Sequence, residues 1–156
     1  MRMISTNVRL AFVLLVLSVS GQSVYGQAKP DGLESELFDL GNQERQAAGL
    51  PALKWDKALA NAARKHALAM AEQGSVAHRL PSEPNLPTRA RQAGVRFLWL
   101  SENVVQGTSV ANIHKLFMNS ATHRGNLLDP EMDAAGFTVV ERGGKLFAVE
   151  DFAQTK

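Results

Sequence analysis

After the first 32 residues, apolar side chains recur at the spacing of one face of a helix. Over residues 33–48, Leu37 and Leu40 lie on one side of the predicted helix, and Gly49 is suited to end it. Residues 50–55 follow as an extended piece, because the proline at position 51 disfavours helix at the residue before it. The pattern predicts one amphipathic helix and a short extended segment.

A second helix is predicted over residues 57–73. Asp56 has the side chain of a good N-cap, and Gly74 follows the last position of the pattern. Its apolar stripe consists of Leu59, Ala62, Ala63, His66 and Met70.

Shorter helices are predicted farther along. One covers residues 87–93, with a proline at its first position and Gly94 after its last. Another runs from a cap at Thr108 or Ser109 to Asn119. Its apolar side is formed by Val110, Ile113 and Phe117.

Strand patterns come late in the chain. Residues 135–141 and 145–152 flank a loop with two glycines, which is a hairpin signal. Between the helices, an apolar run over residues 95–100 precedes the polar triplet Ser-Glu-Asn, where we expect a turn with Asn103 bonding to nearby backbone. Because most of the predicted helices come before the predicted strands, the order of elements favours an α+β fold over a regular βαβ alternation.

The N-terminal segment is expected to be removed. Arg2 and Arg9 precede an apolar stretch of eleven residues, 10–20, which is short for a membrane-spanning helix. We interpret residues 1–26 as a signal peptide cleaved near Gly26 or Ala28, the alternative being an uncleaved amphipathic anchor. The expected organisation is therefore a signal peptide, a linker over residues 27–32 and one domain over residues 33–156, in a secreted or periplasmic protein. No transmembrane segment is expected in the mature chain.

Charge and cysteine content exclude several functions. Without the two arginines of the leader, 15 basic and 15 acidic side chains remain. The mature chain therefore has no excess of positive charge of the kind that nucleic-acid-binding proteins show. The chain has no cysteine, which excludes disulfides, thiolate metal ligands and a cysteine nucleophile.

Three polar side chains could form a site together. His78, Glu102 and His123 are of the types that bind zinc, but they lie 24 and 21 residues apart and match no local ligand motif. His66 is expected to be a hydrogen-bonded core histidine on an apolar helix face, and His114 a surface residue.

Two serines are weaker candidates. Ser101 and Ser120 could be nucleophiles activated by a histidine, but nothing resembles a nucleophile elbow. Ser120 is better explained as the cap of a short turn over residues 122–124.

Four blocks together resemble the bacterial branch of the CAP superfamily of cysteine-rich secretory, antigen 5 and pathogenesis-related proteins (the SCP domain). They are LGNQERQAAGLPALKWDKALANAARKHALAMAEQGSVAHR, LSENVVQG, FMNSATHRGNLLDPEMDAAGF and FAVEDFA, in this order. The resemblance implies a three-layer α-β-α sandwich with a small, mainly antiparallel sheet and a shallow cleft.

The resemblance also implies a site. Members often place two histidines and one or two acids in the cleft, and some bind a divalent metal such as zinc there. The matching positions are His78, Glu102 and His123, which are the candidate metal ligands, and the catalytic residues if the protein is an enzyme. The candidates for supporting roles are Asn103, Ser120, Glu150 and Asp151.

This chain departs from the family pattern at two of the matched positions. Ser101 stands where glycine is usual, which would cause strain if the turn needs positive φ. Phe117 replaces the usual tryptophan, keeping an aromatic ring without its N–H group. Strand alternation allows only one of Glu150 and Asp151 to point to a given side.

Three functions remain open at this point. The favoured one is a binding or interaction module for a small molecule, a lipid or an extracytoplasmic protein. The second is a metal-assisted, protease-like hydrolase, which would require a metal-bound water of lowered pKa. The third is a buried polar cluster that only stabilises the fold.

Overall fold

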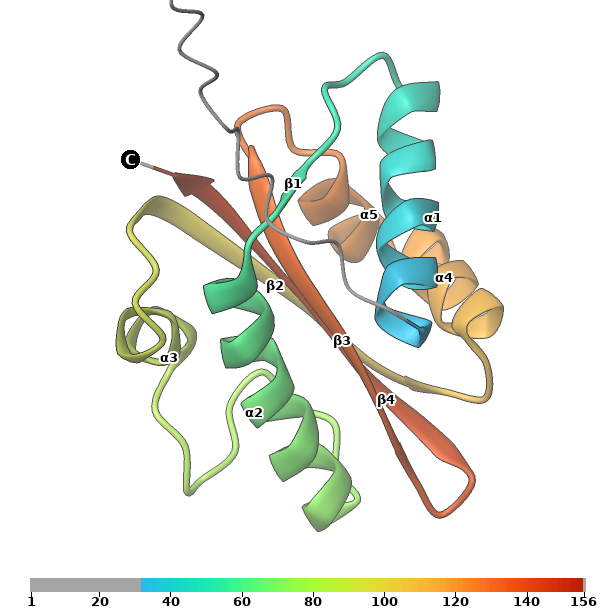
Figure 1. The fold of residues 1–156 in the computed structure, drawn as a ribbon. Coiled ribbons are helices and arrows are strands. Elements are labelled where there is room, and N and C mark those ends of the chain that lie inside the picture. The colour runs from blue at the N-terminus through green and yellow to red at the C-terminus, as the bar shows by residue number, and fades with distance from the viewer. Residues whose placement is uncertain (1–31, 156) are drawn as a thin grey trace, which may run out of the picture.

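Four strands form one sheet in the order β1-β3-β4-β2, with helices on both faces (Figure 1). The computed structural model describes residues 32–155. The short β1 pairs in parallel with β3, while β4 pairs antiparallel with both β3 and β2. The strands are β1 (Lys54–Trp55), β2 (Phe97–Gly107), β3 (Ala134–Arg142) and β4 (Lys145–Thr155). Strand β2 therefore lies at one edge of the sheet.

The helices form two separate layers, one on each face of the sheet (Figure 1). A core cluster that includes Leu37, Phe117 and Leu127 packs helices α1, α4 and α5 on one face. Other clusters pack α2 and α3 on the other face. The helices are α1 (Leu33–Ala47), α2 (Lys57–Gln73), α3 (Leu86–Gln92), α4 (Val110–Asn119) and α5 (Ala121–Leu127). The predicted three-layer α-β-α sandwich is confirmed.

Local caps explain why several helix predictions were accurate. The Asp56 carboxylate accepts hydrogen bonds from the backbone N–H groups of Ala58 and Leu59 at 2.7 and 2.9 Å, so α2 begins where predicted. Gly74 ends α2 with φ 63°. Helix α3 begins one residue earlier than predicted, because Asn85 caps it.

The turn predicted at Ser-Glu-Asn is wrong, because these residues lie inside strand β2. Ser101, Glu102 and Asn103 pair with Phe152, Asp151 and Glu150 of β4, respectively. Within residues 32–155 only glycines have positive φ, so Ser101 carries none of the strain expected from a turn. Glu102 and Asn103 are accommodated within the strand because groups from the two helical layers bond to their side chains, as described below.

The short turn predicted at residues 122–124 is a two-turn helix, α5. The Ser120 hydroxyl accepts a hydrogen bond from the backbone N–H of His123 at 3.4 Å, which confirms Ser120 as the cap. This cap places His123 in the first turn of α5.

Helix α2 touches the sheet at a glycine. A Cβ added to Gly136 of β3 would lie 2.0 Å from the backbone nitrogen of Ala60, so only glycine allows this approach. The contact fixes the position of α2 and hence of His66, which α2 carries.

The predicted signal peptide and most of the predicted linker lie outside the described residues. Among residues 32–155, no helix combines the length and apolar character needed to cross a membrane.

Candidate functional site

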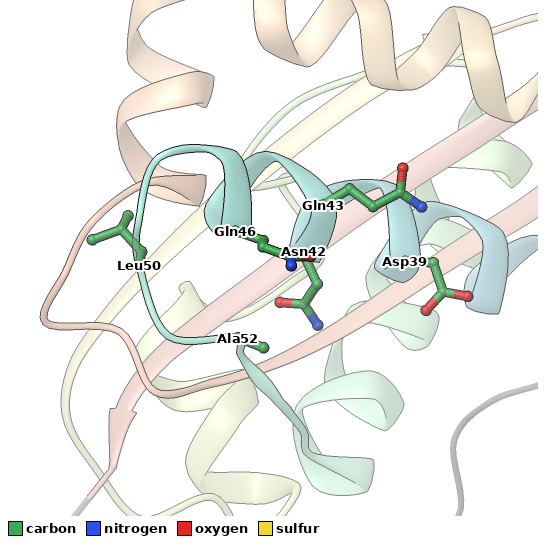
Figure 2. Close-up of a pocket in the computed structure, with 6 residues that line it drawn as sticks. All are labelled: Asp39, Asn42, Gln43, Gln46, Leu50 and Ala52. Carbon is green, nitrogen blue, oxygen red and sulfur yellow. The ribbon is translucent and has the colours of Figure 1, made fainter.

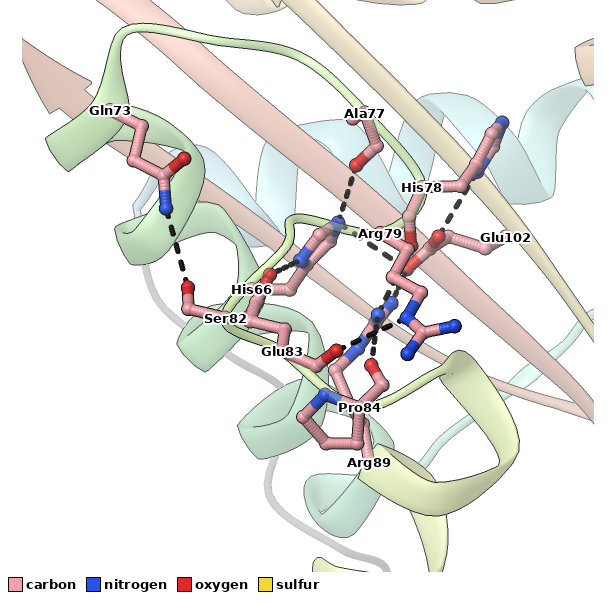
Figure 3. A network of polar contacts seen from close by, with 10 residues as sticks. All are labelled: His66, Gln73, Ala77, His78, Arg79, Ser82, Glu83, Pro84, Arg89 and Glu102. Atoms are coloured by element: carbon pink, nitrogen blue, oxygen red, sulfur yellow. Dashed lines mark hydrogen bonds and ion pairs between the residues drawn. The ribbon is translucent and has the colours of Figure 1, made fainter.

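Glu102 is a buried carboxylate on the side of β2 that faces α2 and α3. Its Oε1 lies 3.0 Å from Nδ1 of His78, and its Oε2 accepts a short hydrogen bond from Nη2 of Arg89 (Figure 3). The strand places Glu102 in the interior, and the other two residues come from the loop after α2 and from α3. Both oxygens of the carboxylate are therefore engaged.

Arg89 is the cation that makes burial of this carboxylate possible. Only 5% of its side chain is exposed, and its Nη1 donates to the backbone oxygens of His78 and Pro84 at 3.1 and 3.3 Å. Arg89 thus ties α3 both to Glu102 and to the loop that carries His78. No pattern in the sequence identified Arg89, although a buried carboxylate requires a partner of opposite charge.

His66 confirms the expectation of a hydrogen-bonded core histidine. Its Nδ1 lies 2.7 Å from Oε2 of Glu83, and its Nε2 lies 2.8 Å from the carbonyl oxygen of Ala77 (Figure 3). A carbonyl oxygen and a carboxylate both accept hydrogen bonds, whereas a neutral imidazole has only one N–H. A proton must therefore lie between His66 and Glu83, in addition to the one on Nε2. His66 holds the loop after α2 at both of its ends.

His78 combines a fixed ring nitrogen with an exposed ring. Its side chain is 62% exposed, and no hydrogen bond within residues 32–155 uses Nε2. The hydrogen bond to Glu102 raises the pKa of His78, although partial burial opposes this shift. The imidazolium is thereby favoured, with Nε2–H available to solvent or a ligand.

Asp151 lies directly across from Glu102 on the same face of the sheet. It is fully buried, and neither carboxyl oxygen has a hydrogen bond of ordinary geometry among the described residues. Burial raises the pKa of Asp151 well above its usual range, and the charge of Glu102 raises it further. Burial and the neighbouring Glu102 carboxylate therefore both disfavour the ionised form of Asp151.

Asn103 organises a second polar cluster on the opposite face of the sheet. Its Nδ2 donates to the backbone oxygen of His123 at 3.0 Å and to Oε2 of Glu150 at 2.9 Å. Its Oδ1 accepts from Nδ2 of Asn126 at 2.8 Å. The predicted local role of Asn103 is wrong, because its side chain bonds across to α5 and β4.

Glu150 is the acid of this second cluster. It is fully buried, and burial raises its pKa to about 8, although the hydrogen bond from Asn103 acts in the opposite direction. Asp151 belongs to the face of Glu102 and Glu150 to the face of Asn103, as strand alternation predicted.

His123 approaches from the layer opposite to that of His78. Its ring packs edge-on against Phe117, with ring centroids 5.3 Å apart. Burial lowers the pKa of His123, and the nearby charge of His78 lowers it further. Because β2 is an edge strand, the two histidines can come near each other around its outer side. No hydrogen bond links the His123 ring to Glu102 among the described residues.

The three predicted metal ligands do not fit a shared metal in this arrangement. Within residues 32–155, no group of three or more His, Asp or Glu side chains is placed to hold an ion. Each oxygen of Glu102 already has a partner, His78 for Oε1 and Arg89 for Oε2. A metal bound by all three residues would compete with these two contacts.

Two other candidates lie away from Glu102. The Ser101 hydroxyl is buried on the face opposite to Glu102 and has no hydrogen-bond partner among residues 32–155. His114 was predicted to be a surface residue, but only 14% of its side chain is exposed. The difference arises because α4 packs beside α1, where Nε2 of His114 contacts Oε1 of Glu44 at 3.2 Å.

A pocket of about 350 Å³ opens along α1 and the segment after it (Figure 2). Its side chains are mostly amides and small apolar groups, and Asn42 already uses its amide to bond both backbone groups of Leu53. The pocket is lined by Asp39, Asn42, Gln43, Gln46, Leu50 and Ala52. None of the residues around Glu102 contributes to it.

Comparison with known proteins agrees with this architecture. The model of the cysteine-rich secretory protein (CAP) family matches residues 38–152. The uncharacterized protein YkwD of Bacillus subtilis is 30% identical over 111 residues, which is 70% of this chain and 43% of YkwD. The chain thus spans less than half the length of this relative.

Two solved structures resemble the fold. An extracellular protein of Bacillus anthracis containing an SCP domain is 27% identical with a TM-score of 0.74, over 80% of this chain and 41% of that one. An outer surface protein of Borrelia burgdorferi has the same TM-score at 19% identity, over 80% of this chain and 93% of that one. The second likeness concerns the fold alone.

Proposed function

Because the chain belongs to the cysteine-rich secretory protein (CAP) family, we propose that it acts outside the cytoplasm as a binding module. The recognition site is the outer side of β2, where His78 and His123 approach from the two helical layers. The extracellular relative of Bacillus anthracis supports this location.

The observation that carries the proposal is the contact between His78 and Glu102. A carboxylate that is itself held by Arg89 fixes Nδ1 of His78 at 3.0 Å, while most of the ring stays exposed. A donor whose orientation is fixed before binding loses little freedom when a ligand arrives. The exposed Nε2–H suits a ligand with a carboxylate or phosphate group, since the imidazolium is favoured.

The polar network also stabilises the fold, and this role does not exclude binding. Arg89 and His66 hold the loop after α2 through backbone oxygens of Ala77, His78 and Pro84. These contacts keep His78 in place, so the buried part of the network supports the exposed part.

The hydrolase alternative gains no support from the arrangement. The Ser101 hydroxyl is buried on the wrong face to be activated by His78. The predicted ligands do not fit a shared metal, so we derive no reaction step through one.

The test compares two histidines that each contact a glutamate. Inorganic phosphate, citrate and a short acidic peptide serve as probes, and binding is followed by NMR of the histidine rings and by thermal shift. We expect the probes to move the NMR signals of the His78 ring in the wild type. We expect the thermal shift caused by the probes to disappear in His78→Ala but not in His114→Ala. The proposal fails if none of the probes moves the His78 signals, or if His78→Ala binds as the wild type does.

A further inference from the structure

One face of α1 carries three amide side chains and a carboxylate. Asn42, Gln43 and Gln46 follow Asp39 by three, four and seven positions, so the four residues share a helix face, opposite to the buried Leu37. They form one wall of the pocket of about 350 Å³, and the segment after α1 runs back beside them (Figure 2). The pocket therefore has a polar wall on a regular helix.

The other wall, residues 50–52, is held in place by buried contacts. Nε of the fully buried Arg45 donates to the backbone oxygen of Pro51 at 2.9 Å, and the backbone N–H of Leu50 donates to that of Arg45 at 2.9 Å. The amide of Asn42 bonds the backbone N–H and C=O groups of Leu53 at 2.8 and 3.2 Å. Because both walls are fixed before binding, little freedom is lost when a ligand enters.

The amide groups of this pocket can both donate and accept further hydrogen bonds. A side-chain amide has two N–H groups and two acceptor positions, and Asn42 uses one of each with Leu53. Gln43 and Gln46 are exposed, and no hydrogen bond among residues 32–155 uses their amides. The wall thus offers donors and acceptors side by side.

The lining excludes charged and strongly apolar ligands. It contains no lysine, arginine or histidine to bind an anion, and its one carboxylate, that of Asp39, already has an interaction partner. No group of three or more metal-binding side chains exists among residues 32–155. The apolar side chains are those of Leu50 and Ala52, without an aromatic ring, which is too little for a lipid chain. An uncharged ligand rich in polar groups remains.

We propose that this pocket binds a neutral carbohydrate, as one or two sugar units. A sugar hydroxyl donates and accepts at the same atom, which matches the paired donors and acceptors of Asn42, Gln43 and Gln46. Leu50 can pack against the C–H groups of a sugar ring. The volume is at the lower end of the range of small-molecule sites, about 300–1,000 Å³, and suits a ligand of this size.

The test follows the side-chain NH₂ signals of Asn42, Gln43 and Gln46 by NMR of the ¹⁵N-labelled protein. The probes are maltose, N-acetylglucosamine and its β-1,4-linked dimer, and the comparison compound is a neutral peptide, N-acetyl-trialanine amide. We expect at least one sugar to move these signals with a dissociation constant in the millimolar range, because the pocket has no aromatic ring. The peptide should not move them.

Two sets of variants locate the binding. Gln43→Ala with Gln46→Ala should weaken sugar binding at least about tenfold, measured on the backbone signals of residues 49–53. The matched control is Gln92→Ala, at an exposed glutamine of α3, which should bind as the wild type does. Circular dichroism confirms that each variant is folded. Equal sugar binding by the double variant and the wild type would overturn the proposal.

Three further outcomes decide the question. The proposal is wrong if none of the sugars moves the three amide signals at up to about 50 mM, well above the expected dissociation constants. It is also wrong if the peptide moves them and the sugars do not. His78→Ala should bind sugars normally, and a loss of sugar binding in this variant would place the sugar at the proposed cleft instead. The two proposals can therefore fail independently.

Discussion

Asn103 and Glu150 face each other across β2 and β4, and Nδ2 of Asn103 donates to Oε2 of Glu150 at 2.9 Å. The same amide group donates to the backbone oxygen of His123. A buried acid, a strand and the first turn of α5 are thus joined through one side chain. Asn103 therefore links the carboxyl group of Glu150 to the first turn of α5.

Glu150→Gln should make stability less dependent on pH. The pKa of Glu150 is about 8 in the folded protein, above its ordinary value of 4.5, so folding retains its proton. This contribution is complete below pH 4.5 and is lost as the pH rises towards 8. Because of this shift, the free energy of unfolding of the wild type should fall by on the order of 3–5 kcal/mol between these two pH values. The free energy of unfolding of Glu150→Gln should fall much less.

The measurement is urea unfolding at several pH values between about 4.5 and about 9, which span the shifted titration. Glutamine keeps an acceptor for Asn103 and resembles the neutral acid, which makes it a conservative change. An unchanged slope of unfolding free energy against pH in Glu150→Gln would contradict the assignment.

Glu102→Ala should destabilise the fold strongly. It would leave the Arg89 guanidinium buried without its anion, which typically costs about 3–5 kcal/mol. The matched control is Glu44→Ala, at a carboxylate that is 40% exposed and contacts His114, where a loss below about 1 kcal/mol is expected. Similar unfolding free energies for the two variants would show that Arg89 does not depend on Glu102.

Glu102→Gln separates binding from stability. Glutamine can still accept from Arg89 through its oxygen, but it cannot favour the imidazolium of His78. We expect a smaller loss of stability than for alanine, together with weaker binding of anionic probes at neutral pH. Full binding by a folded Glu102→Gln would contradict the proposed role in orienting His78.

Zinc should not stabilise the protein through His78, Glu102 and His123 together. No group of three or more His, Asp or Glu side chains within residues 32–155 is placed to hold an ion, and a metal would compete with the contacts of Glu102 to His78 and Arg89. We expect micromolar zinc to change the melting temperatures of the wild type and His78→Ala equally. A rise seen in the wild type, and absent from both His78→Ala and His123→Ala, would support the metal hypothesis instead.

Gly136→Ala should be among the most damaging single substitutions. The new methyl group would lie 2.0 Å from the backbone nitrogen of Ala60 and 2.4 Å from the carbonyl carbon of Leu59, and backbone cannot move aside easily. We expect a loss of at least about 3 kcal/mol or failure to fold. The control is Gly125→Ala in α5, where nothing lies within 4 Å and alanine should be neutral or stabilising by up to about 1 kcal/mol. Thermal unfolding followed by circular dichroism compares the two variants.

The helices could be predicted because their signals are local. Asp56 and Gly74 delimit α2 within the same short segment that carries its apolar stripe. The hairpin of β3 and β4 likewise has its strands and turn close together in the sequence. The polar residues of β2 were predicted as a turn and not as a strand. The side chains that bond to Glu102 and Asn103 come from α3 and α5, so the local sequence does not show that these polar residues can be buried in a strand.

The same distinction applies to the site. The resemblance selected His78 and Glu102, and the structure places them in contact. Their role as metal ligands, with His123, stays a prediction. The sequence around Arg89 and Asn126 did not indicate a role for either residue. Their roles depend on the buried side chains that they contact, Glu102 and Asn103, which are distant in the sequence.

The strand order has a consequence for the biosynthesis of the protein. Strands β3 and β4 occupy the centre of the sheet, and β1 and β2 each pair only with one of them. A nascent chain that has not yet reached residue 134 therefore has neither a sheet nor a surface on which α2 can pack. The sheet, and with it the packing of α2, can therefore form only after residues 134–155 have been synthesised.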